Sequence, residues 1–283
     1  MHPLLCKTQS GRLAYNKHRR PNQLFQISGG SMTARNATLW ANRLGVQALM
    51  LLCCQSLTAQ ENASNPLAAV NNTDVRFKSL DLGKGADKQD AYIDGAYMLR
   101  PDLKLKYELH YNSTNASGSR ETSFEKVGVK AIYFPNERKL SETWGMRTAV
   151  GLEWIYDLGE AGTGIGPGAD QLAPFAGVAF ANLNTGLTLI PLVQHFASYN
   201  GSTDISQTSA RLIALQPFAD TWWIKADLKL PYNWENDTWP ASAEVQLGKN
   251  LSDGVALYGD VLVGLSKDRT FDQGIGVGLR FKY

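Results

Sequence analysis

The stretch Leu103-Lys-Leu-Lys-Tyr-Glu-Leu-His-Tyr111 decides the fold. Its odd-numbered residues are all aliphatic or aromatic, and its even-numbered residues are Lys, Lys, Glu and His. Successive side chains of a β-strand point to opposite faces. The stretch therefore predicts a strand with one fully apolar face and one charged or polar face.

The same alternation recurs through the rest of the chain, most clearly over residues 144–157, 222–230, 241–247 and 275–283. These segments are about 9–14 residues long, against about 5–6 for the usual strand, which matches a tilted membrane span. Aromatic residues such as Trp154 and Trp239 lie near their ends, as in the interfacial girdles of membrane barrels. A soluble β-sandwich, which also alternates, is the competing interpretation. The length and the aromatic ends favour an all-β, antiparallel transmembrane β-barrel.

Twelve strands are expected, an even number as in bacterial single-chain barrels. Their predicted ranges are 74–82, 89–100, 103–112, 122–134, 143–157, 170–181, 186–199, 206–218, 221–231, 240–248, 254–265 and 273–283. If the last strand ends in the periplasm, alternate connections should be short inner turns. Four of these five are tight, and residues 135–142 are the exception. The outer connections include the Gly-rich residues 158–169, whose Gly162–Gly168 run lacks the helix and the Lys of a phosphate-binding loop.

The N-terminal part has the charge and composition of an export leader. Residues 1–59 hold seven of the 28 basic residues and no acidic residue, so the remainder carries 21 basic and 26 acidic residues, a net charge of −5. Met32 begins a signal-like segment in which Arg35 and Arg43 precede an apolar core of about 11 residues, too short to span a bilayer. A buried core helix, or lipid attachment at Cys53, is the less favoured interpretation.

The sequence predicts four regions in the chain. Residues 1–31 are expected to be an untranslated upstream extension, 32–59 a cleaved signal peptide, 60–73 a periplasmic N-terminal segment, and 74–283 the barrel in the outer membrane of a Gram-negative bacterium. All three cysteines lie within the first 59 residues, which excludes disulfides, Cys-bound zinc and Cys nucleophiles from the barrel. No metal cluster, cofactor site or nucleic-acid surface is expected. Whether residues 60–73 enter the barrel is left open.

The polar faces of the strands supply the candidate functional residues. The predicted pore-lining residues are Lys104, Lys106, Glu108, His110, Arg147, Glu153, Lys225, Asp227, Lys229, Glu244, Asp260 and Arg280. Basic residues are in excess on these faces although the exported chain is acidic, and rings of Lys and Arg favour anions. The sequence thus predicts a passive transporter or narrow channel for small solutes. A non-conducting barrel whose charges pair with one another is the alternative.

A third possibility, a membrane esterase, depends on one short run. His195-Phe-Ala-Ser198-Tyr-Asn200-Gly201 resembles the His-x-Ser-Asn-Gly active-site run of outer-membrane phospholipase A, also a twelve-stranded barrel. In that family the His and the Ser are two residues apart and share a face. Here they are three apart, which puts them on opposite faces unless a bulge intervenes. We therefore expect no catalytic residue, and no enzyme.

The last third of the chain, residues 170–283, resembles a family of transporter-like outer-membrane barrels, similar to the meta-pathway phenol-degradation proteins. The resemblance is carried by strand and turn patterns over residues 216–225, 231–237, 245–249 and 276–283. It implies a barrel for passage of small organic molecules and defines no binding residue. The terminal strand, Ile275 to Tyr283, also resembles the aromatic signature recognised by the barrel-assembly machinery. That machinery and outer-membrane lipid are the expected partners.

Overall fold

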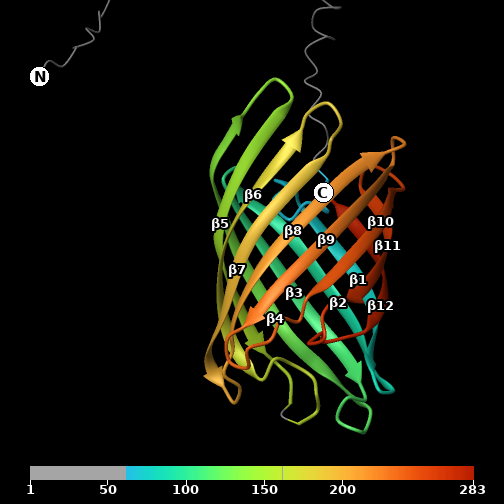
Figure 1. Cartoon of the computed structure of the whole chain (residues 1–283). Coiled ribbons are helices and arrows are strands. Elements are labelled where there is room, and N and C mark those ends of the chain that lie inside the picture. Colours follow the sequence, from blue (N-terminus) through green and yellow to red (C-terminus); the bar gives the residue numbers. More distant parts are fainter. Residues whose placement is uncertain (1–61, 161) are drawn as a thin grey trace, which may run out of the picture. The chain divides into compact units, whose positions relative to one another are not determined.

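The computed structural model describes residues 62–160 and 162–283. The upstream extension predicted for residues 1–31, the signal peptide predicted for 32–59 and the option of lipid attachment at Cys53 lie outside these residues. The described part forms a single closed antiparallel β-barrel (Figure 1). No helix within it is long and apolar enough to cross a bilayer.

Twelve strands make the barrel, and each pairs with its neighbours in the chain, while the first strand pairs with the last. They are β1 (Asn72–Gly83), β2 (Ala86–Arg100), β3 (Leu103–Thr114), β4 (Glu121–Lys139), β5 (Trp144–Asp157), β6 (Ala169–Asn182), β7 (Thr188–Gly201), β8 (Ser206–Phe218), β9 (Trp222–Asn233), β10 (Ser242–Asn250), β11 (Val255–Gly264) and β12 (Gln273–Lys282). The predicted fold class is confirmed. Most strand ends fall within three residues of their predicted positions.

The long inner connection expected over residues 135–142 is wrong. Strand β4 continues through Pro135 to Lys139, and the turn occupies only residues 140–143. The β4–β5 register shifts between Tyr133 and Asn136, so Pro135 lies where the ladder is already interrupted. A proline has no backbone N–H to donate and is tolerated at such a bulge. All five inner connections are therefore short.

The two ends of the barrel differ in their connections. The C-terminus lies at the end with the short turns (Figure 1). The tightest of these is the two-residue connection Pro101-Asp102 between β2 and β3. Ala219 and Asp220, in the three-residue connection between β8 and β9, have positive φ values of +44° and +56°. The longer loops, including residues 158–160 with 162–168 and residues 234–241, gather at the opposite end. Following the usual orientation of such barrels, we name the ends periplasmic and extracellular.

The outer surface of the barrel is apolar. Side chains such as Val193, Val261 and Ile275 point outward and are 50%, 63% and 66% exposed. Aromatic residues lie toward both ends of this surface, among them Tyr97, Phe281, Trp154 and Trp239. A closed barrel with a greasy exterior is stable in lipid, since every backbone group is paired and no strand edge is left open.

Candidate functional site: the lumen of the barrel

All twelve candidate residues named from the sequence lie on the inner face of the barrel. Eight of them are buried, and Lys106, Glu108, Arg147 and Lys229 are half-buried. Sequence reasoning missed several inner residues, above all Asp74, Arg76 and Lys78 of β1 and Arg211 of β8. The β1 residues alternate with Val75 and Phe77, so the same period-two signal could have found them.

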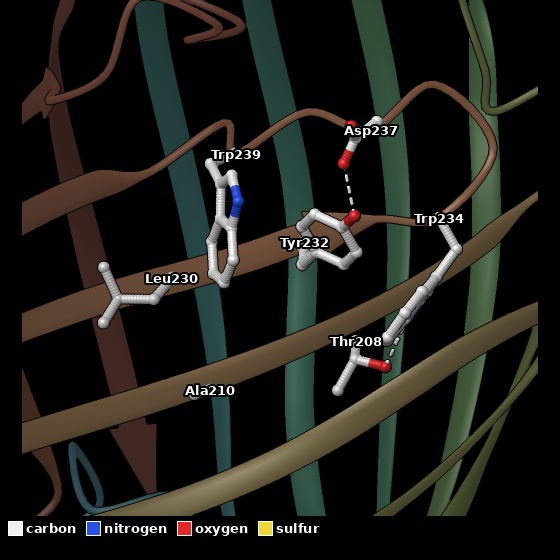
Figure 2. A pocket seen from close by; sticks show the side chains of 7 residues that line it. All are labelled: Thr208, Ala210, Leu230, Tyr232, Trp234, Asp237 and Trp239. Carbon is white, nitrogen blue, oxygen red and sulfur yellow. Dashed lines mark hydrogen bonds between the residues drawn. The ribbon is translucent and has the colours of Figure 1, made fainter.

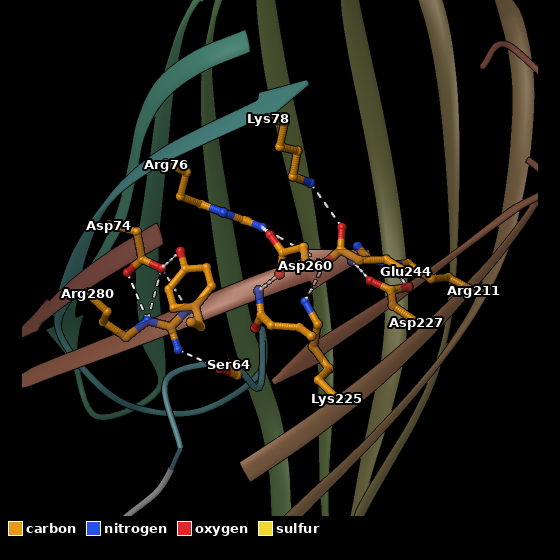
Figure 3. Close-up of polar contacts among 12 residues, drawn as sticks. Ser64, Asp74, Arg76, Lys78, Arg211, Lys225, Asp227, Glu244, Asp260 and Arg280 are labelled. Atoms are coloured by element: carbon orange, nitrogen blue, oxygen red, sulfur yellow. Dashed lines mark hydrogen bonds and ion pairs between the residues drawn. The ribbon is translucent and has the colours of Figure 1, made fainter. Parts of the chain in front are cut away.

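One carboxylate, Glu244, organises the largest group of charges, which we call the Glu244 network (Figure 3). Its oxygens lie 2.9 Å from Lys78 Nζ, 2.9 Å from Lys225 Nζ and 3.9 Å from an Arg76 nitrogen. Arg76 also pairs with Asp260 at 2.8 Å, and Arg211 pairs with Asp227. The members are Arg76, Lys78, Arg211, Lys225, Asp227, Glu244 and Asp260. The network joins β1 to strands β8 through β11 across the lumen.

A second group links the first and last strands. Arg280 Nη2 lies 2.6 Å from Asp74 Oδ2, and Tyr258 donates a hydrogen bond of 2.6 Å to the same oxygen. Arg280 Nη1 also donates to Ser64 Oγ at 2.6 Å. Removing two charges from water is costly unless they are paired and hydrogen-bonded, as Asp74 and Arg280 are here.

Glycines make room for the inward-pointing rings. A Cβ at Gly278 would lie 2.2 Å from the Tyr258 ring, and a Cβ at Gly248 would lie 2.1 Å from the Trp223 ring. In each pair the glycine is directly opposite the aromatic residue in the ladder. The glycines on the polar faces of β10 and β12 thus let these rings lie flat against the wall.

A third group lies on the opposite wall. Lys126 pairs with Glu108 at 2.7 Å, and Lys130 pairs with Glu153 at 2.6 Å. Gln194 donates a further hydrogen bond of 2.5 Å to Glu153. Most inner charges are therefore matched by an opposite charge on another strand.

Three charged residues of the inner face are exceptions among the described residues: Lys106, Lys229 and Asp94, whose buried Oδ1 has no hydrogen-bond partner. Lys106 and Lys229 form neither an ion pair nor a hydrogen bond with another residue of that part of the chain, and both are half-buried on the inner face. Asp94 and Glu108 are the opposite charges nearest in effect to Lys106. Glu244 and Asp227 are those nearest in effect to Lys229, but neither lysine is held in an ion pair. These two side chains are the best-placed groups for contact with an anion in the lumen.

The chain preceding β1 enters the periplasmic end of the lumen. We call residues 62–71 the plug segment. Lys104 Nζ donates to the carbonyl oxygens of Ala68 at 2.7 Å and Pro66 at 3.3 Å, and Arg147 donates to that of Leu67 at 3.1 Å. With the Ser64–Arg280 bond, the segment is held from β3, β5 and β12. Part of the region expected to be a periplasmic segment thus lies inside the barrel.

An apolar cluster surrounds the plug segment. Leu67 and Ala68 are 1% and 0% exposed. Leu67 packs in a group, here named the plug cluster, that comprises Leu67, Ile132, Phe134, Ala149, Phe175, Ala179, Ile190 and Ile213. Its wall residues come from β4 to β8, where the inner face changes from charged to apolar near the short turns. This change explains why the plug segment docks there.

The His195 and Ser198 side chains do not meet. The β6–β7 register is regular from Gln194 to Ser198, so no bulge brings these residues onto one face, and the bulge lies just beyond Ser198. His195 points outward, where Nδ1 lies 2.9 Å from Thr208 Oγ1, while Ser198 Oγ accepts a hydrogen bond from Ile205 N. His195 and Ser198 therefore lie on opposite faces of β7, as expected.

Thr208 belongs to a pocket of about 510 Å³ on the outer surface near the extracellular loops (Figure 2). The pocket is lined by Thr208, Ala210, Leu230, Tyr232, Trp234, Asp237 and Trp239. Tyr232 donates to Asp237, and Trp234 Nε1 donates to Thr208 at 3.0 Å. Rings with apolar bodies and hydrogen-bonded polar tips are typical of the membrane interface. The contact of His195 with Thr208 belongs to this girdle.

Comparisons with known proteins give a likeness of fold. No protein-family model matches the sequence, and no curated protein matches it. An outer-membrane channel from Pseudomonas putida F1 aligns with a TM-score of 0.56 at 10% identity over 77% of this chain and 97% of its own. The KdgM porin in complex with disordered oligogalacturonate has a TM-score of 0.51 at 11% identity, over 75% of this chain and 99% of its own. The NanC porin has a TM-score of 0.51 at 9% identity, over 75% of this chain and all of its own. The chain thus has the fold of twelve-stranded outer-membrane barrels.

Proposed function

We propose that the protein is a passive channel for small solutes in the outer membrane, closed at its periplasmic end by the plug segment. The observation that carries the proposal is a charged inner wall inside a barrel whose outside is apolar. Lys106 and Lys229 form no ion pair, so their ammonium groups are available to a solute, and lysines that line a pore favour anionic solutes.

The similar structures support this proposal through their printed names, since they are porins and a channel. One of them is described with oligogalacturonate, an acidic sugar polymer. The resemblance of residues 170–283 to the meta-pathway phenol-degradation proteins suggests small organic molecules as solutes. A small organic acid satisfies both arguments.

A non-conducting structural barrel is the second candidate, and the plug cluster favours it. An apolar constriction excludes water and ions, and the plug cluster would act as one. In the channel proposal the blocked lumen is a closed state, which ends when the plug segment withdraws from the plug cluster. In the structural proposal the plug segment blocks the lumen permanently.

An enzymatic role is not part of the proposal. His195 and Ser198 lie on opposite faces, so the imidazole cannot take the hydroxyl proton. We further propose lipid as the surroundings of the outer belt, and the barrel-assembly machinery as the partner that recognises Ile275 to Tyr283.

Planar-bilayer recording of the refolded mature chain tests the channel proposal. We expect small or infrequent currents from the wild type and steady currents from Leu67→Glu, because a carboxylate cannot remain in the plug cluster. Leu251→Glu, in the exposed turn between β10 and β11, is the matched control and should behave as wild type. If Leu67→Glu folds, as judged by heat-dependent gel mobility, and neither conducts nor admits solutes into liposomes, the structural barrel is the correct function.

Ion selectivity tests the role of the unmatched lysines. In the Leu67→Glu background we expect anion preference, and we expect Lys106→Glu with Lys229→Glu to weaken or reverse it. Lys267→Glu, in the loop between β11 and β12, is the control. Cation preference before the lysines are changed would refute the anion assignment.

A further inference from the structure

Three side chains on adjacent strands converge at one place on the inner wall. His110 Nδ1 of β3 lies 3.0 Å from each carboxylate oxygen of Asp90 on β2 and 3.9 Å from Oε2 of Glu125 on β4. One ligand atom from each residue lies within 4.8 Å of the other two. We propose that Asp90, His110 and Glu125 bind a divalent transition-metal ion of the zinc class inside the lumen.

The spacing of these atoms suits such an ion. Zinc binds histidine nitrogen and carboxylate oxygen at about 2.0–2.2 Å in tetrahedral geometry, so two ligand atoms lie roughly 3.4 Å apart. The Nδ1 distances of 3.0 Å to Asp90 and 3.9 Å to Glu125 lie on either side of that value, so small side-chain movements would complete the site. Two carboxylates balance the charge of the ion, and a single imidazole with carboxylate oxygens favours zinc over calcium or magnesium.

The neighbours of the three residues hold them in orientations that suit metal binding. Lys88 pairs with Oε1 of Glu125 at 2.7 Å and leaves Oε2 facing His110. The Tyr92 ring stacks on the imidazole with centroids 4.4 Å apart and planes 13° from parallel. Metal-binding histidines usually donate their second ring nitrogen to a carboxylate. Nε2 of His110 lies 3.8 Å from Oε2 of Glu108, and a small rotation would complete that arrangement.

Unpartnered polar atoms at the same place are the independent observation. Among the described residues, six buried side-chain nitrogen and oxygen atoms lack a hydrogen-bond partner, and three of them are His110 Nε2, Asn112 Nδ2 and Asn112 Oδ1. Asn112 is fully buried and lies directly opposite Asp90 in the β2–β3 ladder. An orphaned buried amide calls for a ligand, a water molecule or an ion. Asn112 also lies two residues from His110 on the same inner face, so its amide is the candidate for contact with the ion or with a water molecule bound to it.

An ion could reach the site from the lumen. The side chains of His110, Asp90 and Glu125 are 11%, 13% and 14% exposed. All three lie in the halves of their strands nearer the extracellular loops, away from the plug cluster. The site therefore does not depend on opening of the periplasmic end, and its existence is independent of the channel proposal.

Titration of the refolded protein with ZnCl₂, followed by calorimetry, tests the site. We expect one zinc ion per chain, and an affinity at least tenfold weaker in His110→Ala and in Asp90→Asn. His195→Ala is the matched control, because His195 is the other histidine of the described residues and points to the outside of the barrel. Its zinc affinity should equal that of the wild type.

A spectroscopic measurement keeps the proposal testable if a variant folds poorly. Cobalt(II) added to the wild-type protein should give the intense visible absorption of four-coordinate cobalt, and Glu125→Gln should diminish it. Folding of each variant is checked by heat-dependent gel mobility. The site is refuted if wild type binds no zinc, or if His110→Ala binds zinc as tightly as wild type does. It is likewise refuted if the cobalt spectrum remains that of the hydrated ion.

Discussion

The plug cluster and the Glu244 network are two ways of filling the same lumen. The plug cluster packs Leu67, carried by a segment outside the sheet, against apolar residues of β4 to β8. The Glu244 network pairs side chains that belong to the wall itself. Apolar packing is undirected and can be released by withdrawing one segment, whereas each charge of the network requires its partner in place. The first is suited to a removable closure, and the second to a permanent lining.

The largest effect is expected from Glu244→Gln. It leaves Lys78 and Lys225 without the carboxylate that both contact at 2.9 Å. Removing one partner of buried ion pairs costs about 3–5 kcal/mol, so the barrel should unfold at a clearly lower urea concentration. The measurement is urea unfolding in lipid vesicles, followed by gel mobility. Glu235→Gln, in the loop between β9 and β10, is the control, and equal stability of the Glu244 variant would show that the network is only a solvated lining.

An intermediate effect is expected from Leu67→Ala. Truncating a buried leucine costs about 2–5 kcal/mol, which here falls on docking of the plug segment and leaves the closed sheet intact. Hydrogen exchange of residues 62–71 should accelerate by roughly a hundredfold for a loss of about 3 kcal/mol, while exchange in the strands is unchanged. If the strands lose protection along with the segment, the plug cluster is part of the barrel core and no removable closure exists.

The smallest effect is expected from Ile213→Val. Ile213 is fully buried in the plug cluster, and the loss of one methylene group should cost about 0.5–1.5 kcal/mol. Ile275→Val, on the lipid-facing surface, should cost less because lipid fills the space. Unfolding in urea compares the two variants. A larger cost at Ile275 would mean that packing against lipid outweighs packing in the plug cluster.

The strands could be predicted because period-two alternation is a local signal. Leu103–Tyr111 shows it without interruption, and the observed β3 contains it entirely. Where the local signal misleads, the prediction fails: Pro135 predicts a turn, but β4 continues past it through a bulge. A proline lacks a backbone N–H. Only the pairing register of the two strands shows whether the missing N–H would have formed a hydrogen bond.

The lumen could be predicted only as a list of inward residues. That Glu244 meets Lys78, 166 positions away, depends on closure of β1 onto β12 and on the side chains that reach across the barrel. Asp90, His110 and Glu125 likewise come together through the register of three strands. The docking of the plug segment could not be predicted. The segment shows no alternation, and its contacts are with residues far from it in the sequence.

Arg280 has a consequence for the order in which the molecule is assembled. The residue belongs to the last strand, yet it binds Asp74 at the start of the first strand and Ser64 in the segment before it. Arg280 therefore supplies both a contact across the β1–β12 junction and the hydrogen bond that holds Ser64. A chain whose last strand has not yet paired lacks both contacts. We therefore expect the plug segment to dock in the same step in which the barrel closes.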